Sequence, residues 1–396
     1  VSDYQEHEKE GQHSVSLSLM NLDWKEKKIN ILDAPGYLDF QGEAIGALKV
    51  SDFAVIMVSA VNGVEVGTEL VWEMANENNL SKAIIINMLD RDNANFENVL
   101  SMLQARYGKK VFPLMIPINH GENFNEIGDV LRKVIFNYQT DGSGKYTETT
   151  ADGDMNDRLQ TLHSEIIELI AESDDSLLEI FFDQGELTEE QMRGGLHKAI
   201  LMGGVIPVFC ISAKNNIGVN RVMDIIARYA PCTSDLPTLK GIKPGSDEEI
   251  STGCKVNDPT TALVFKTVNE AHIGEFSFFR VFGGTIKNGD NLINTTRNDK
   301  ENFRQVFTMV GKNRKDTDNL IAGDIGAAVK LKNTHTGDTL TINGHSFIVK
   351  PIDYPKPSMR MAVTPQSRGD EEKMSEGLSV MHEEDPTFQY KFDPEL

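Results

Sequence analysis

The chain has 396 residues, of which 39% are hydrophobic and 25% charged, and its formal net charge is −21. This composition is typical of a folded protein with two or three domains and excludes global disorder. The acidic balance excludes a protein that coats nucleic acid, because such a protein needs a broad basic face. DNA is therefore not an expected partner.

The sequence shows no sign of secretion, membrane insertion or disulfide bonding. It has no run of about eighteen apolar residues and no signal peptide, so we expect a cytoplasmic protein without a membrane partner. Its three cysteines, Cys210, Cys232 and Cys254, are widely spaced and fit neither a disulfide framework nor a zinc signature. The chain opens on Val1 instead of Met, and we interpret it as a fragment.

The first half of the chain has the pattern of an open α/β sheet. Alternating apolar residues at 15–19, resumed at 29–32, predict a β-hairpin. Unbroken aliphatic runs at 53–58, 83–86 and 205–211 predict parallel strands buried on both faces. Helical spacing of apolar residues between these runs predicts helices that carry Leu70, Val71 and Met74, and Val99, Leu100 and Leu103.

The remaining segments predict an insertion and two further domains. We expect an α/β domain over residues 1–235 that is interrupted at about 113–204 by a polar hairpin (138–148) and a helix. Residues 236–258 lack periodicity and predict a linker. Short strands separated by Gly-rich turns predict a small β-barrel over 259–352. Within 355–396 the pattern predicts a strand at 359–363, a helix carrying Met374, Leu378 and Met381, and a strand from Thr387.

Asp33-Ala34-Pro35-Gly36 follows directly after a predicted strand. Open α/β sheets bind ligands at the carboxyl ends of their strands. A carboxylate at Asp33 can reach Mg²⁺ through a bound water. The backbone N–H of Gly36 can donate to a γ-phosphate, and the backbone can swing away once that phosphate has been released. This pattern is weak by itself and needs other residues beside it.

Two more polar groups follow buried strands, Asn87-Met88-Leu89-Asp90 and Ser212-Ala213-Lys214. The Asp90 carboxylate can accept hydrogen bonds from N1–H and the exocyclic amine of guanine, a donor pair that adenine lacks. The N–H of Ala213 can reach the guanine O6, and Asn87 can tie the two loops together. Strand-end Asx turns are the alternative for Asn87 and Asp90. Three such groups in this order favour a guanine site.

These three groups resemble the third, fourth and fifth motifs of translational GTPases, and residues 29–91 resemble elongation factor G. The resemblance covers essentially the whole chain, including residues 265–340 and Glu384-Asp385-Pro386-Thr387-Phe388, which is similar to that factor's third domain. It implies a GTPase domain of the P-loop NTPase type with an inserted subdomain, a translation-factor β-barrel and the start of a ferredoxin-like domain. It also implies GTP or GDP and Mg²⁺ as ligands and the ribosome, both RNA and protein, as partner.

The sequence departs from that family in several places. No G-x-x-x-x-G-K-[ST] loop occurs, and Gly142-Ser143-Gly144-Lys145 is interpreted as a turn. Tyr37 stands where most relatives have the histidine that positions the attacking water, so the chain resembles a branch with Asp-Ala-Pro-Gly-Tyr. A packing role against the following helix is the alternative for Tyr37. Met88 replaces the lysine of the family's N-K-x-D motif. The threonine that binds Mg²⁺ in the family has no clear counterpart in this sequence, and Ser14 is its possible substitute.

Two functions remain open from the sequence. The first is a GTP-hydrolysing, elongation factor G-like protein that promotes translocation on the ribosome, with Gly36 and Tyr37 as catalytic residues. The second is a ribosome-binding or nucleotide-sensing factor with little or no GTP turnover; ribosomal protection proteins and a release-factor GTPase share these early domains. We expect a monomer, and Lys312-Asn313-Arg314-Lys315 is the candidate ribosomal RNA contact, with a solvated turn as the alternative.

Overall fold

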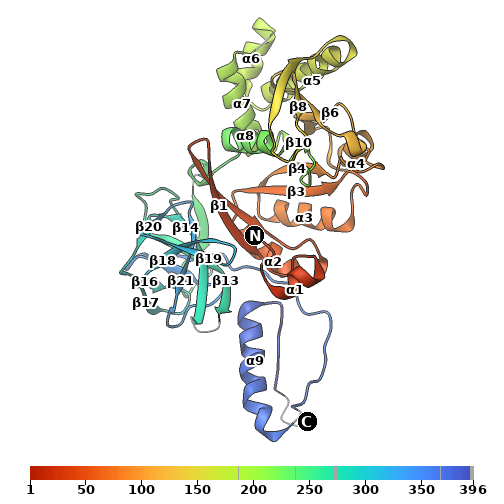
Figure 1. Cartoon of the computed structure of the whole chain (residues 1–396). Coiled ribbons are helices and arrows are strands. Elements are labelled where there is room, and N and C mark those ends of the chain that lie inside the picture. The colour runs from red at the N-terminus through yellow and green to blue at the C-terminus, as the bar shows by residue number, and fades with distance from the viewer. Residues whose placement is uncertain (186, 237, 271–273, 366, 393–396) are drawn as a thin grey trace. The chain divides into compact units, whose positions relative to one another are not determined.

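The computed structural model describes residues 1–396 except 186, 237, 271–273, 366 and 393–396. The chain divides into two compact units, whose elements are labelled in Figure 1. Unit 1 consists of Val1–Leu22, Lys28–Ser51 and Cys232–Leu396, and unit 2 consists of Asp23–Lys27 and Asp52–Pro231. The domain boundaries expected from the sequence stay predictions.

Unit 2 is built around a parallel sheet with the strand order β3-β4-β10-β5. Its strands are β3 (Phe53–Ser59), β4 (Ser81–Asn87), β10 (Ile206–Cys210) and β5 (Val111–Pro113). The α/β fold and the parallel strands are therefore confirmed. The prediction that β3 is buried on both faces is wrong, because its side chains alternate between buried and exposed, and Val55 and Met57 on the open face are 37% and 52% exposed. β3 is also an edge strand of this sheet.

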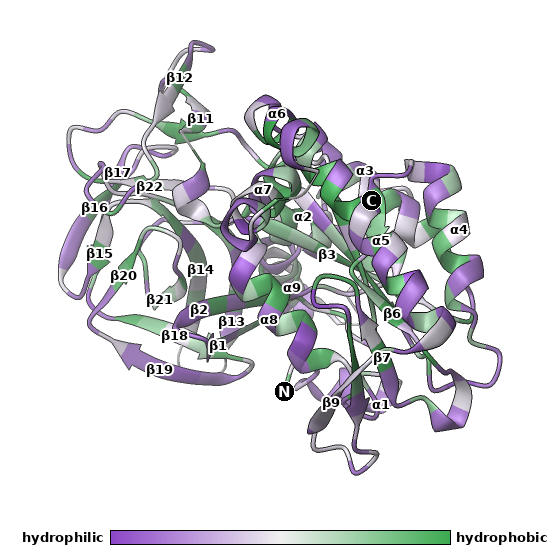
Figure 2. Cartoon of the chain, turned by 90° about the horizontal axis from the view of Figure 1, so that it is seen from above, coloured by the Kyte–Doolittle hydropathy of each residue, from purple (hydrophilic) through white to green (hydrophobic). Residues whose placement is uncertain are grey.

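Helix α3 (Val66–Glu77) follows β3, α4 (Phe96–Tyr107) follows β4 and α8 (Val219–Tyr229) follows β10. Helix α4 begins after Asn95, whose side chain accepts the N–H of Asn98 at 2.9 Å and so caps the first turn. Figure 2 shows hydrophobic and hydrophilic residues on α4, whose apolar positions Val99, Leu100 and Leu103 are buried. The two predicted helices are confirmed.

A second sheet in unit 2 follows β5. It is antiparallel and has the order β6-β7-β8-β9, with β6 (Met115–Pro117), β7 (Glu126–Asp129), β8 (Val134–Tyr138) and β9 (Tyr146–Thr150). Helices α5 (Gly153–Glu172), α6 (Asp175–Gln184) and α7 (Glu189–Leu201) come next (Figure 1). Residues 139–145 connect β8 to β9, so the interpretation of Gly142 to Lys145 as a turn is confirmed.

The start of unit 1 contains α1 (Glu6–Gly11) and α2 (Gln41–Lys49), which follows the short 3-10 helix Leu38–Phe40. It also contains most of the hairpin strands β1 (Ser18–Trp24) and β2 (Lys27–Asp33), whose residues near the turn, 23–27, are assigned to unit 2. The predicted hairpin is confirmed, but its first strand begins three residues late. The N–H groups of Val15 and Ser16 donate to Glu8 Oε1, and that of Leu17 donates to Glu43 Oε2. These carboxylates replace strand partners.

The rest of unit 1 is β-rich, as expected. Its main sheet is antiparallel with the order β17-β16-β22-β13-β14-β21-β18-β19. Strands β11, β12 and β23 form a separate sheet, and β15 pairs with β20. The strands of this part of unit 1 are β11 (Leu239–Ile242), β12 (Glu249–Thr252), β13 (Thr261–Glu270), β14 (Gly274–Gly283), β15 (Thr285–Lys287), β16 (Asp290–Asn294), β17 (Asp299–Phe303), β18 (Val306–Val310), β19 (Asn313–Thr317), β20 (Asn319–Ile321), β21 (Ile325–Val329), β22 (Thr339–Thr341) and β23 (Ile348–Val349).

The C-terminal segment contains helix α9 (Glu371–Glu384), as predicted. The strands predicted at 359–363 and from Thr387 are wrong, because these residues pair with no strand in the described part of the chain. Met359 and Met361 stay 79% and 83% exposed. An isolated extended segment has no ladder to satisfy its backbone. Among the described residues, no helix has the length and apolar character needed to cross a membrane.

Candidate functional site

Two strand-end loops of unit 2 meet because β4 and β10 are parallel neighbours, which places their carboxyl ends at one edge of the sheet. Asn87 is the last residue of β4, and its Oδ1 accepts the N–H of Ala213 at 2.9 Å. Ser212 Oγ donates to Asp90 Oδ1 at 2.7 Å. The structure thus brings together Asn87, Asp90, Ser212 and Ala213, as the sequence predicts for one site.

The Ala213 N–H is already used within the protein. We expect it to bind the guanine O6, yet here it donates to Asn87. Asn87 has a second polar atom, Nδ2, and its main-chain oxygen accepts the N–H of Ala60 at 2.8 Å. A base that takes the Ala213 N–H therefore has to displace a single side-chain oxygen, and both loops keep their backbone hydrogen bonds.

Met88 occupies the turn directly after β4. Its φ of 69° lies in the left-handed region, which costs roughly 1 kcal/mol or more for a residue with a side chain. The turn is closed by the N–H of Arg91, which donates to the Met88 carbonyl at 3.1 Å. The thioether is 44% exposed and accepts from Ser59 Oγ at 3.9 Å.

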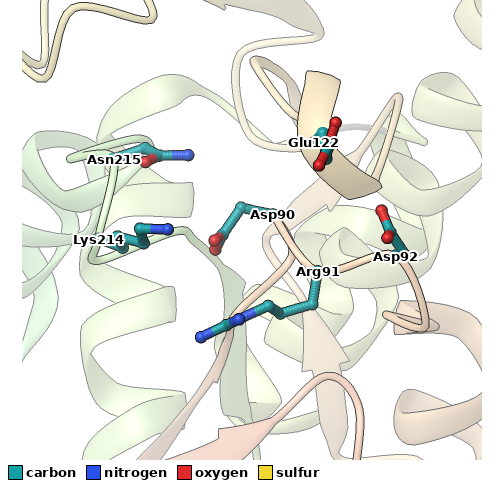
Figure 3. A pocket seen from close by; sticks show the side chains of 6 residues that line it. All are labelled: Asp90, Arg91, Asp92, Glu122, Lys214 and Asn215. Atoms are coloured by element: carbon teal, nitrogen blue, oxygen red, sulfur yellow. The ribbon is translucent and has the colours of Figure 1, made fainter.

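A polar cleft of about 290 Å³ opens beside these loops. It is lined by Asp90, Arg91, Asp92, Glu122, Lys214 and Asn215. Figure 3 shows Lys214 and Asn215 on one side, Asp92 and Glu122 on the other, and Asp90 between them. The volume is close to the lower limit of small-molecule sites, roughly 300 Å³. The cleft therefore offers both carboxylates, which accept hydrogen bonds, and the cationic side chains of Arg91 and Lys214, which donate them.

Sequence reasoning missed four of the lining residues. Arg91, Asp92 and Asn215 adjoin predicted site residues, so their neighbourhood was a usable signal. Glu122 gave no such signal. It sits in a 3-10 helix (Gly121–Asn123) that is held to the first loop by the N–H of Gly121, which donates to the Leu89 carbonyl at 2.8 Å.

The remaining predicted site residues belong to unit 1. Asp33 is the last residue of β2, and its carboxylate makes no hydrogen bond or ion pair with the described residues. It is half-buried. Ala34 and Pro35 lead to Gly36, where an added Cβ would meet nothing within 4 Å. Glycine is thus not required at this position by contacts in the present conformation.

Tyr37 and Ser14 also lie in unit 1. The Tyr37 side chain is 59% exposed, and its ring meets that of His13 edge-on with centroids 5.1 Å apart. Ser14 Oγ donates to Asp3 Oδ1 at 2.8 Å, so Mg²⁺ binding by Ser14 would compete with this bond. No group of three or more metal-binding side chains is clustered among the residues that the structure describes.

Glu8 fixes the loop that carries Ser14. Its side chain is 1% exposed, and it accepts the N–H groups of Gln5, Val15 and Ser16. Burial alone raises the pKa of this carboxyl, but the backbone hydrogen bonds outweigh it and the pKa lies below its ordinary value. The charged form is therefore the one that holds the loop.

The basic cluster 312–315 lies largely on β19, an end strand of its sheet in unit 1. Its side chains are exposed, and the Arg314 guanidinium lies 5.4 Å from the centroid of the Phe307 ring. A row of exposed cations on an edge strand can contact phosphate groups, as the sequence predicts, although the edge is also a common place for solvating charges.

Three family models match the chain. Residues 1–232 match the elongation factor Tu GTP binding domain, residues 259–343 match elongation factor G domain 2, and residues 354–395 match elongation factor G domain III. A crystal structure of a Thermus thermophilus protein is similar over 100% of this chain, with a TM-score of 0.86 and 26% sequence identity. The chain spans 56% of the length of that protein.

Proposed function

The chain belongs to the elongation factor G-like translational GTPases, and from this premise we propose that the cleft of unit 2 reads the guanine base of GTP and GDP. The observation that carries the proposal is the fixed Asp90 carboxylate. Ser212 Oγ donates to one of its oxygens, and Asp90 lines the cleft with Lys214. A positioned carboxylate can pair with N1–H and the exocyclic amine of guanine.

Base selection provides a direct test of this role. Asp90→Asn should shift preference from guanine to xanthine nucleotides, because an amide can donate to the extra xanthine oxygen that a carboxylate repels. Asp92→Asn is the matched control, since Asp92 lines the same cleft but is not held by Ser212. Competition between GDP and XDP for each variant gives the answer. Unchanged guanine preference in Asp90→Asn removes Asp90 from the base site.

The phosphate end of the nucleotide is assigned to Asp33 and Gly36. The free Asp33 carboxylate supports a water-mediated contact with Mg²⁺, and the open space at Gly36 supports a backbone that turns toward a γ-phosphate. Bound Mg²⁺ would neutralise charge on the β- and γ-phosphate oxygens. The 396 residues contain no G-x-x-x-x-G-K-[ST], so we assign no other phosphate contact within them.

GTP hydrolysis on the ribosome, with a role in translocation, is the activity that we propose for the whole protein. Tyr37 would orient the attacking water through its phenolic hydroxyl, which can donate and accept a hydrogen bond. The same substitution motivates the second candidate, a ribosome-binding or nucleotide-sensing factor with little or no GTP turnover. GTP turnover by the full-length protein with and without ribosomes separates them: a rate that ribosomes do not raise contradicts the enzyme.

The ribosome is the proposed partner, and a monomer in the cytoplasm is the proposed working form. The exposed cations of β19 support a contact with ribosomal RNA phosphate groups. Replacing Lys312, Arg314 and Lys315 together by Ser should weaken ribosome binding and reduce its salt dependence. Ribosome co-sedimentation at several salt concentrations measures this. Binding that is unchanged at every salt concentration would place the RNA contact elsewhere.

Affinity for labelled GDP should be compared between this chain and the same chain extended at its N-terminus. Binding by the extended protein alone locates the missing affinity in the phosphate contacts and supports the proposed base site. If neither protein binds, Met88 and Tyr37 mark a degenerate nucleotide site, and a ribosome-binding factor that does not use the nucleotide becomes the better account.

A further inference from the structure

We propose that the turn between β8 and β9, residues 139–145, is a positioning element that sets the affinity of the base-reading loop 212–217. The inference rests on the proposed function of that loop. It concerns residues in the second sheet of unit 2, which carries none of the predicted nucleotide contacts. Two asparagines connect the turn to the base-reading loop. Asn216 lies within the loop, and Asn220 lies in helix α8, which follows it.

The base-reading loop is closed at its neck. The N–H of Ser212 donates to the Ile217 carbonyl at 3.1 Å, and the N–H of Ile217 donates back to the Ser212 carbonyl at 3.0 Å. Between them, Asn216 adopts a left-handed φ of 53°. Within this closed loop the N–H of Asn216 donates to the Ala213 carbonyl at 3.3 Å, so the position of Asn216 is coupled to that of Ala213.

The turn holds Asn216 from outside the loop. Asn216 Nδ2 donates to the Gly142 carbonyl at 3.1 Å. Gly144 is buried, and a Cβ built on it would lie 2.8 Å from the same Nδ2 atom. The backbone at Gly144 therefore packs against the Asn216 amide so closely that no larger residue fits without moving it.

A second contact fixes the turn to the helix that follows the loop. Asn220, in the first turn of α8, donates from Nδ2 to the Gly144 carbonyl at 3.0 Å. Its Oδ1 accepts the hydroxyl of Tyr138 at 2.9 Å, and Tyr138 is 3% exposed at the end of β8. Both ends of the Asn220 amide are thus used by the hairpin, which defines where the turn lies.

The loop is consequently held from two sides. Asn87 and Asp90 hold Ala213 and Ser212 from the side of the cleft, and the turn holds Asn216 from the other. Because the loop must present Ala213 and Lys214 to the base, loosening one side costs ordering free energy when the nucleotide binds. The turn is a positioning element in this sense, and its residues touch no reacting atom.

The chain offers two matched pairs of variants. Gly203→Ala and Gly144→Ala introduce the same strain, at φ values of 70° and 69°, but only the second meets Asn216, because a Cβ on Gly203 meets nothing within 4 Å. Asn216→Gly and Asn79→Gly make the same change at residues with the same φ of 53°, and Asn79 lies at the end of α3. The two variants of each pair change the backbone in the same way, but only one of them alters the contact between the turn and the loop.

The experiment measures GDP dissociation and amide hydrogen exchange on the full-length protein. We expect Gly144→Ala and Asn216→Gly to weaken GDP binding about fivefold, the effect of one hydrogen bond, and to speed exchange in residues 212–217. Gly203→Ala and Asn79→Gly should stay within about twofold of the unaltered protein.

Two results would overturn the proposal: equal behaviour within each matched pair, or faster loop exchange with unchanged GDP affinity. If the unaltered protein binds no GDP, the proposed function itself fails. The exchange comparison then still shows whether the turn holds the loop, so the two failures are distinguishable.

Discussion

Ser212 Oγ donates to Asp90 Oδ1 over 2.7 Å and at the same time accepts the N–H of Asn215 at 3.2 Å. One hydroxyl therefore orients the proposed base-reading carboxylate and closes the loop that carries Lys214. A hydrogen bond to a charged group contributes about 1.5–3 kcal/mol. Both effects disappear when the hydroxyl is removed.

Ser212→Ala should accordingly weaken GDP binding about tenfold or more while leaving the fold intact. Ser101→Ala is the control, because Ser101 is exposed on α4 and its hydroxyl donates to the Glu97 carbonyl of its own helix. Titration with a fluorescent GDP on the full-length protein measures both. An affinity in Ser212→Ala equal to that of the control would mean that Asp90 needs no support.

Gly36→Ala should separate folding from phosphate sensing. An added Cβ would meet nothing within 4 Å, so we expect the melting temperature to stay within about 2 °C. GTP hydrolysis should fall at least tenfold if the backbone at Gly36 must turn toward the γ-phosphate, because alanine restricts that turn. Retained hydrolysis in a stable variant would argue against a role for the Gly36 backbone.

Tyr37→His should raise ribosome-stimulated hydrolysis, since an imidazole can orient a water and carry a positive charge near neutral pH. The side chain is 59% exposed, so the substitution should leave stability unchanged. Tyr37→Phe is the matched control that keeps the ring beside His13 and removes the hydroxyl. Single-turnover rates with ribosomes compare the three proteins. Equal rates in all three would exclude Tyr37 from the hydrolytic step.

The Glu8 carboxylate predicts a pH-dependent loop. Its pKa is lowered in the folded chain, so it stabilises the fold fully above the ordinary carboxyl pKa of about 4.5, and this contribution is lost as the pH falls through the lower, folded-state value. Glu8→Gln should therefore speed amide exchange of Val15 and Ser16 at pH 7 and matter little in strong acid. Glu10→Gln is an exposed control. Equal effects of both variants at pH 7 would contradict the assignment.

The strands that frame the base site could be predicted because their aliphatic runs are long and unbroken. Residues 83–86 are fully or almost fully buried in β4. The polar residues at the end of β4 and after β10 lie side by side, because the two strands are parallel neighbours. The β3 strand has the same kind of sequence, yet Val55 and Met57 are exposed. Composition alone cannot distinguish a central strand from an edge strand.

Contacts between distant loops could not be predicted. Glu122 reaches the cleft through a backbone hydrogen bond from Gly121 to Leu89, and backbone partners leave no trace in the sequence. The same holds for the carbonyls of Gly142 and Gly144 that accept from Asn216 and Asn220. The late start of β1 was hidden for a related reason, because two distant carboxylates take the N–H groups that precede it.

A buried ion pair in unit 1 gives the last prediction. Lys266 Nζ on β13 lies 2.7 Å from Glu43 Oε2 on α2, the helix that follows Gly36, and Glu43 also accepts the Leu17 N–H at 2.8 Å. Their side chains are only 10% and 18% exposed. Removing one partner of such a pair leaves an uncompensated charge and costs roughly 3–5 kcal/mol.

Lys266→Met should therefore destabilise α2 and β13 strongly, whereas Lys243→Met should cost under about 1 kcal/mol, because Lys243 and its partner Glu248 are both more than half exposed. The double variant Glu43→Gln/Lys266→Met should recover much of the loss, since it removes both charges and keeps an acceptor for Leu17. Amide exchange of α2 and β13 reports the local opening free energy. If the double variant is no better than Lys266→Met, the cost lies in packing around the lysine stem and the charge pair does not join α2 to β13.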